Sequence, residues 1–201
     1  MTQITFVRHG QTDWNLHRRI QGTTDIPLND TGRDQARRAG EELAGGEWDA
    51  ILSSRLGRAH ETAEIIAEQV GLSTPSILDG LQERAHGDME GMTFDERQAA
   101  FPGDTVVPGL ETRDAVIARV LAALDGSEHV TNDTRILAAS HGGVIGSLIR
   151  YATGGEQPTA GQVIANGSYH DFSWSAGALT LVTLRAIEAD KDLPPVRLPQ
   201  R

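Results

Sequence analysis

The chain has 201 residues and no cysteine, and 38% of its residues are hydrophobic while 23% are charged. These values are typical of one folded globular domain, and they exclude a disordered chain, a disulfide framework and a cysteine-ligated metal site. The formal net charge of -10 at pH 7 argues against a nucleic-acid partner, because neutralising a phosphate backbone requires a surface rich in Lys and Arg.

The predicted elements are short β-rich runs that lead through polar or glycine-containing turns into segments of helical periodicity. In chain order we expect a strand at 4–7, a helix at 31–44, a strand at 50–53, helices at 58–70, 93–100 and 113–125, a strand at 136–139, a helix at 144–153, and strands at 169–174 and 179–185. The last two runs alternate like antiparallel strands. This order predicts an α/β fold of three layers, α/β/α, with a largely parallel sheet and antiparallel C-terminal strands.

The ends of the chain bear on its domain organisation and location. No basic residue precedes a long apolar run at the N-terminus, and no later stretch could span a bilayer. We therefore expect no membrane partner and a cytoplasmic location. We also expect a single domain over residues 1–188 and a flexible C-terminal tail over 189–201, where the composition shifts to Asp, Lys and Pro.

Polar segments follow three of the predicted strands. They are Arg8-His9-Gly10, the run 54–59 and Ser140-His141-Gly142-Gly143. Because ligands of open α/β sheets gather beyond the carboxyl ends of strands, we expect these segments to share one site. An imidazole beside a guanidinium, followed by a glycine, leaves room for a large anion against the backbone. Taken alone, however, a histidine at the end of a strand is more often a hydrogen-bonded structural residue.

Arg8-His9-Gly10 is the start of a longer series of motifs, and these motifs support a functional role for His9. The first motif consists of Arg8, His9, Gly10, Thr12 and Asn15, which match R-H-G-x-T/S-x-x-N. The motifs that follow are Gln21-Gly22, the run 53–59 with Arg58, the run 81–91 with Glu83, and the run 140–143 with His141. In this order they resemble the histidine phosphatase superfamily, also called the phosphoglycerate mutase-like family.

The resemblance implies a phosphoglycerate mutase-like fold and a phosphatase that hydrolyses a small-molecule phosphate ester through a phosphohistidine at His9. Neutral imidazole can attack phosphorus through one ring nitrogen while the other is held by a hydrogen bond. Arg8 and Arg58 would hold phosphate oxygens, and His141, if protonated, would add charge and a donor. Glu83 would give a proton to the leaving oxygen and later take one from water.

The remaining site residues are expected to bind and not to react. Asn15, Gln21 and Gly22 are the candidates for binding substrate or phosphate, although an asparagine in a loop also stabilises turns. No cofactor and no metal are expected, because the arginines and histidines could replace Mg²⁺ and the other histidines lack metal-ligand spacing.

Two other functions stay open at this stage. A cofactor-dependent phosphoglycerate mutase would use the same half-reaction and pass the phosphoryl group to a bound acceptor, but the short interval before the run 140–143 favours a phosphatase. A non-catalytic phosphate-binding scaffold usually lacks the nucleophile or an arginine, and this chain keeps both. The sequence also allows a homodimer.

Overall fold

The central element is a six-stranded sheet, seen in a computed structural model that describes residues 1–159, 161–185 and 187–189. Its strands are β1 (Thr2–Arg8), β2 (Ala50–Ser53), β3 (Ser76–Ile77), β4 (Arg135–Ser140), β6 (Tyr169–Ser175) and β7 (Ala178–Thr183). They lie in the order β3-β2-β4-β1-β6-β7. The first four pair in parallel, whereas β6 and β7 are antiparallel. The predicted largely parallel sheet with antiparallel C-terminal strands is confirmed.

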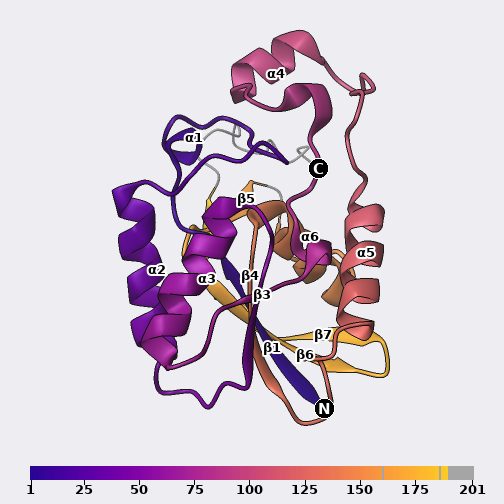
Figure 1. The fold of residues 1–201 in the computed structure, drawn as a ribbon. Helices are drawn as coiled ribbons and strands as arrows, with labels where there is room; N and C mark the ends of the chain where they lie inside the picture. Colours follow the sequence, from indigo (N-terminus) through magenta and orange to yellow (C-terminus); the bar gives the residue numbers. More distant parts are fainter. Residues whose placement is uncertain (160, 186, 190–201) are drawn as a thin grey trace.

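Helices cover both faces of this sheet (Figure 1). The helices are α1 (Asp13–Leu16), α2 (Asp30–Leu43), α3 (Gly57–Val70), α4 (Phe94–Ala100), α5 (Arg113–Asp125) and α6 (Gly142–Ala152), with 3₁₀ turns η1 (Asp79–Leu81) and η2 (Gly87–Met89). Helices α2 and α3 lie together on one face, α5 and α6 lie on the other, and α4 stands apart from the sheet at the top of the view. The three-layer prediction is therefore confirmed. None of the helices in the described ranges is long and apolar enough to cross a bilayer.

Local signals in the sequence explain where two of the helices begin and end. The side chain of Asn29 caps α2 by accepting a hydrogen bond from Gly32 N at 2.9 Å. Helix α3 ends at Gly71, which has the left-handed φ of 75° that glycine adopts without strain. Both boundaries agree with the prediction from sequence.

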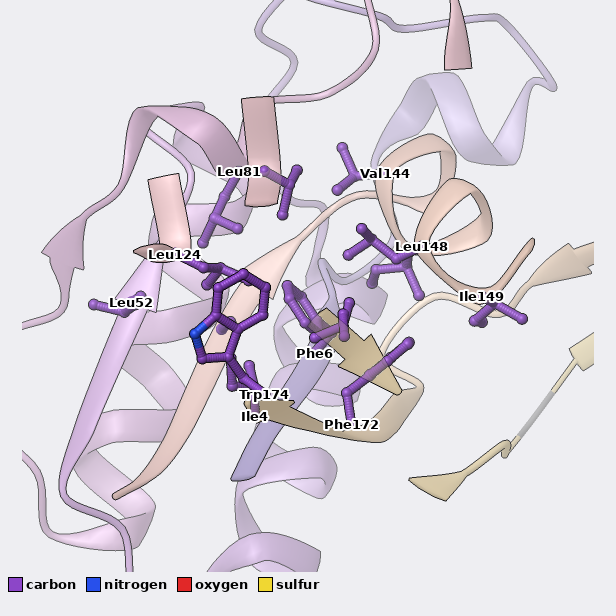
Figure 2. Packing of buried hydrophobic residues seen from close by; sticks show 14 of the residues in the cluster. Ile4, Phe6, Leu52, Leu81, Leu124, Val144, Leu148, Ile149, Phe172 and Trp174 are labelled. Atoms are coloured by element: carbon purple, nitrogen blue, oxygen red, sulfur yellow. The ribbon is translucent and has the colours of Figure 1, made fainter. Parts of the chain in front are cut away.

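The larger core lies between the sheet and the face formed by α5 and α6. Figure 2 shows Phe6 of β1 beside Phe172 of β6, with Leu148 of α6 nearby. The two phenyl rings meet edge to face with centroids 5.3 Å apart. Each fully buried side chain of this kind stabilises the fold by about 1.5–3 kcal/mol. This packing fixes β1 and α6, and both elements lead directly to the site described below.

Several short elements were missed by the prediction from sequence. These are α1, β3, the two 3₁₀ turns, and a two-stranded antiparallel sheet of β5 (Gln162–Ile164) and β8 (Ile187–Ala189). Strand β8 runs to Ala189, one residue past the boundary expected at 188. The rest of the expected tail, 190–201, lies outside the described residues.

Candidate active site

Two histidines meet at the carboxyl ends of the adjacent parallel strands β1 and β4. The register pairs Arg8 with Ser140, and His9 N donates to the Ser140 carbonyl oxygen at 2.9 Å. The rings of His9 and His141 therefore lie side by side, with centroids 5.1 Å apart and an interplanar angle of 61°. Both side chains are buried. The expected convergence of the first and third polar segments is thus found.

His9 is held in one tautomer. Its Nδ1 lies 2.7 Å from the Gly10 carbonyl oxygen, an acceptor, so Nδ1 carries the hydrogen and Nε2 keeps its lone pair. Burial, and next the charges of Arg8 and Arg58, hold the pKa of His9 well below its ordinary value. The ring is therefore neutral at pH 7, which is the form that attacks phosphorus.

Arg58 is fully buried at the start of α3. Its terminal nitrogens donate to the carbonyl oxygens of Thr24 and Gly22, each at 2.8 Å. Its Nε is buried and has no hydrogen-bond partner within the described part of the chain. The guanidinium is thus rigidly held, and its Nε–H can still be donated to an anion.

The ring of His141 has no hydrogen bond among the described residues, although both of its nitrogens are buried. Burial, followed by the charges of Arg58 and His9, lowers its pKa well below the ordinary value. The protonated form that the sequence left conditional is therefore disfavoured by the surrounding side chains. A neutral His141 still has one N–H donor, and the negative charge of a bound phosphate would favour protonation.

Arg8 completes the cationic cluster. Its NH1 donates to the Ile164 carbonyl oxygen, and a Cβ added to Gly142 would lie 3.2 Å from its Nε. The guanidinium therefore packs against the N-terminus of α6, where a side chain at position 142 would make a tight contact with it. A buried donor without a partner costs about 1–3 kcal/mol, so a site that keeps such donors on Arg58 and His141 is best satisfied by an anion.

Glu83 lies in the segment between η1 and η2 and reaches the same helix end. Its Oε2 accepts from Gly143 N at 3.1 Å, and its Oε1 accepts from Arg84 N at 2.8 Å. Because Gly143 follows His141 by two residues, the half-buried carboxylate lies at the edge of the histidine cluster. The structure thus brings Glu83 into the same site as His9, Arg8, Arg58 and His141.

The three residues expected to bind phosphate have supporting contacts. Asn15 Oδ1 accepts from Thr12 N at 3.1 Å in the capping box of α1, so its Nδ2 is the atom left for a ligand. Gln21 Oε1 accepts from Thr12 Oγ1 at 3.0 Å. Gly22 has a φ of 56° and contributes the carbonyl oxygen that holds Arg58.

Glu90 supports the loop that holds Arg58. Its Oε1 accepts from Thr23 N at 2.9 Å and its Oε2 accepts from Thr24 N at 3.0 Å. Burial opposes ionisation here, but hydrogen bonds from Thr24 and Thr23 outweigh it and lower the pKa of Glu90. Glu90 thus holds the loop whose carbonyl oxygens accept from Arg58.

Glu111 ties the segment of Glu83 to helix α5. It accepts from Arg119 Nε at 2.8 Å and from Ala85 N at 3.2 Å. Arg119 NH2 also donates to the Glu83 carbonyl oxygen at 3.3 Å. Arg119 belongs to no motif, so its contact with the segment of Glu83 could not be predicted from the sequence.

Asn166 is a further site residue that the sequence prediction missed. Its Nδ2 donates to the His9 carbonyl oxygen at 3.0 Å. The available signal was the Asn-Gly turn at 166–167 ahead of β6, which marks a turn and says nothing of a partner so far away in the chain.

The arrangement suits capture and attack of a phosphoryl group. It combines a neutral imidazole, two guanidinium groups and a second imidazole with a carboxylate that accepts a hydrogen bond from the N-terminus of α6. Among the described residues, no group of three or more His, Asp or Glu side chains is arranged to hold a metal ion.

Sequence comparisons agree with this geometry. A sequence model described as histidine phosphatase superfamily (branch 1) matches residues 4–187. The chain is similar to an uncharacterized phosphatase, PhoE, of Bacillus subtilis, with 41% identity over 156 residues that cover 78% of this chain and 80% of that protein. It is also similar to phosphoglycerate mutase-like protein 4 of Arabidopsis thaliana, with 38% identity over 186 residues that cover 85% and 78% of the two chains.

Solved structures share the fold. A mycobacterial glucosyl-3-phosphoglycerate phosphatase in complex with VO3 is 32% identical with a TM-score of 0.76, over 90% of this chain and 97% of that one. YhfR of Bacillus stearothermophilus is 29% identical with a TM-score of 0.78, over 91% and 96% of the two chains. Both similarities extend over nearly the whole described chain.

Proposed function

Because the chain belongs to the histidine phosphatase superfamily, branch 1, we propose that it hydrolyses a small-molecule phosphate monoester through a phosphohistidine formed on His9. The family predicted from the sequence motifs is confirmed. One observation carries the mechanism: His9 is a neutral imidazole of fixed tautomer beside buried donors on Arg58 and His141 that have no partner among the described residues.

In the first half-reaction, His9 Nε2 forms a bond to phosphorus as the bond to the ester oxygen breaks. The Gly10 carbonyl oxygen keeps its hydrogen bond from Nδ1 and so stabilises the positive charge that the ring gains. Arg8, Arg58 and His141 hold the equatorial oxygens, where charge accumulates in the transition state. Glu83 transfers a proton to the departing alkoxide.

In the second half-reaction, water attacks the phosphorus of phosphohistidine and the P–N bond breaks. Glu83, now ionised, takes the proton from this water, so one carboxyl group serves both steps. Inorganic phosphate leaves and His9 returns to its neutral form. The two hydrogen bonds from backbone amides hold the Glu83 carboxylate in one orientation, which favours proton transfer along the same line in both steps.

The test compares the wild-type protein with His9→Ala on a panel of phosphosugars, phosphoglycerate derivatives and nucleotide-pathway monophosphates. We expect phosphate release by the wild type alone. Brief incubation with a ³²P-labelled substrate should label the wild type with an acid-labile, base-stable phosphoryl group. A folded wild type that binds inorganic phosphate but hydrolyses no ester would instead favour the non-catalytic scaffold.

We also propose that the reaction is independent of metal, because two guanidinium groups and an imidazole supply the positive charge and donors that Mg²⁺ would supply. Prolonged treatment with a chelator should leave the rate of phosphate release unchanged. Loss of the activity on chelation, restored by a divalent ion, would contradict this assignment.

A phosphoglycerate mutase is the second candidate, favoured by the likeness to the Arabidopsis mutase-like protein. Both activities use the same half-reaction and differ in whether water or a bound acceptor receives the phosphoryl group. Incubation with 3-phosphoglycerate and catalytic 2,3-bisphosphoglycerate separates them. We expect phosphate release to exceed formation of 2-phosphoglycerate, and the reverse ratio would assign a mutase.

A further inference from the structure

The segment that leads from β5 into β6 clamps the backbone of the nucleophile. Gly167 N donates to the Arg8 carbonyl oxygen at 3.1 Å and to that of His9 at 3.3 Å, and Arg8 N donates to the Ser168 carbonyl oxygen at 2.9 Å. The side chain of Asn166 reinforces this clamp. Its Nδ2 donates to the His9 carbonyl oxygen at 3.0 Å and to Asn15 Oδ1 at 3.2 Å. Both hydrogens of one amide group are therefore used, and both act on residues of the site.

The first of these bonds acts on the direction of the nucleophile. The His9 carbonyl oxygen belongs to the peptide that joins His9 to Gly10, and the next carbonyl along the chain accepts the hydrogen on His9 Nδ1. A shift of this peptide would move the acceptor and with it the imidazole plane. Asn166 therefore holds the backbone frame on which the direction of the Nε2 lone pair depends.

The second bond acts on the orientation of an amide group. Asn15 Oδ1 accepts from Asn166 Nδ2 and from Thr12 N, so both neighbours require an oxygen at this position. A flipped amide would place N–H groups against two donors. The Nδ2 of Asn15 consequently points away from them and is presented as a donor.

We propose that Asn166 is a positioning residue for the phosphoryl transfer assigned to this chain: it aligns His9 for attack and fixes the Asn15 amide as a phosphate donor. This inference rests on the proposed function. In this proposal Asn166 acts through His9 and Asn15 and not by contact with the substrate. The two effects can be measured separately. Misalignment of His9 lowers kcat, whereas loss of the Asn15 orientation weakens phosphate binding.

The experiment is a double-mutant cycle of Asn166→Ala and Asn15→Ala, with Ser168→Ala as the matched control. Ser168 lies in the same turn, and alanine at this position keeps the backbone carbonyl oxygen that accepts from Arg8 N. The substitution removes only a hydroxyl, which donates to the Ala165 carbonyl oxygen and lies 3.2 Å from His170 Nε2, and which contacts neither His9 nor Asn15. kcat and KM are measured on p-nitrophenyl phosphate, binding of inorganic phosphate by calorimetry, and Tm by scanning calorimetry.

We expect Asn166→Ala to lower kcat at least tenfold and to weaken phosphate binding several-fold, with Ser168→Ala close to wild type in both. The double variant should bind phosphate no more weakly than the worse single variant, because the two side chains act on phosphate through one donor. A merely structural role would lower Tm in both turn variants and leave the effects on phosphate binding additive.

Wild-type kcat and phosphate affinity in Asn166→Ala, fully additive losses, or equal losses in Ser168→Ala would each overturn the proposal. If Asn166→Ala does not fold, Asn166→Asp keeps the size and replaces the donor by an acceptor, and it should weaken phosphate binding at least as much as alanine would. The binding cycle needs no turnover, so it tests the positioning role even if the wild type proves inactive on every ester.

Discussion

The carboxylate of Glu83 is held by the amides of Arg84 and Gly143, and this makes its proposed role testable by an isosteric change. Glu83→Gln keeps the size of the side chain but cannot give a proton to an alkoxide. We expect a loss of about 10²–10⁴-fold in kcat on alkyl phosphates, the range typical of general acid–base catalysis, and a much smaller loss on p-nitrophenyl phosphate. Steady-state kinetics on the two substrates give the comparison. Equal losses would remove Glu83 as the acid.

The lowered pKa of His9 predicts an unusual pH dependence. An ordinary histidine protonates as the pH falls through about 6.5, and a nucleophile of that kind would lose its activity there. Burial and two arginines keep His9 neutral at this pH, so kcat/KM should show no loss that titrates with a midpoint near 6.5. The profile is measured from pH 5 to 8 and corrected for ionisation of the substrate. A midpoint at the ordinary histidine value would contradict the burial argument.

The same shift has a consequence for folding. Because the pKa values of His9 and His141 are lower in the folded than in the unfolded state, the unfolded chain binds more protons below about pH 6.5. The stability of the folded state is therefore greatest above the unfolded pKa and falls as the pH decreases below it. His170, whose pKa is lowered by burial to about 4, adds to this loss between about pH 6.5 and 4. Urea unfolding at pH 7.5 and 5.5 should give a lower unfolding free energy at 5.5.

The identities of the residues that meet at the site could be predicted from sequence, but their protonation states could not. His9, Arg58 and His141 stand in motifs that follow predicted strands or begin predicted helices. Their protonation depends on burial and on neighbours contributed by separate elements, and no local pattern records this. Asn166 was missed for the same reason, since its partner His9 lies 157 residues earlier in the chain.

At the scale of elements, helix α5 is tied to the segment of Glu83, the proposed acid, because Arg119 donates to Glu111 and to the Glu83 carbonyl oxygen. Glu111→Gln removes the charge that holds Arg119 and the Ala85 amide, so the segment of Glu83 becomes less constrained. We expect kcat to fall, and to fall more on alkyl than on aryl phosphates, in the same sense as for Glu83→Gln. The measurement is the ratio of kcat on the two substrate classes.

Asp34→Asn is the matched control for this change. It breaks the exposed pair between Asp34 and Arg37 on α2, away from the site, and exposed pairs contribute little to stability. In this variant neither kcat nor the ratio of kcat on alkyl and aryl phosphates should change. A Glu111→Gln protein with an unchanged substrate ratio would show that α5 contributes only to stability.

The longer elements could be predicted because their hydrophobic periodicity and the capping residues at their ends are local features of the sequence. Helices α2 and α3 carry their own signals in Asn29 and Gly71. Strands β3, β5 and β8 have only two or three residues each and exist because a partner strand is adjacent. Such strands depend on tertiary pairing, which a window of sequence does not contain.

At the scale of the whole molecule, a chain of net charge -10 gathers Arg8 and Arg58 around one buried point. Apolar packing on both faces of the sheet offsets the repulsion between these charges, because α6 and α3 are each fixed to the sheet by their own apolar cluster. The three-layer architecture thus holds charges together that would repel one another in a looser chain. The order of strands and helices predicted this architecture, and the charge cluster forms because β2, β4 and β1 are neighbours in the sheet.

The buried donors of Arg58 and His141 also predict that binding of an oxyanion stabilises the folded state. A ligand that binds only the folded chain raises its unfolding free energy by RT ln(1 + [L]/Kd), about 2.7 kcal/mol at a concentration of 100 Kd. Inorganic phosphate should therefore raise the Tm of the wild type in a concentration-dependent manner, and chloride at equal ionic strength should not. Melting temperatures measured in phosphate buffer would then report occupancy as well as intrinsic stability, and Arg58→Ala should abolish the dependence on phosphate.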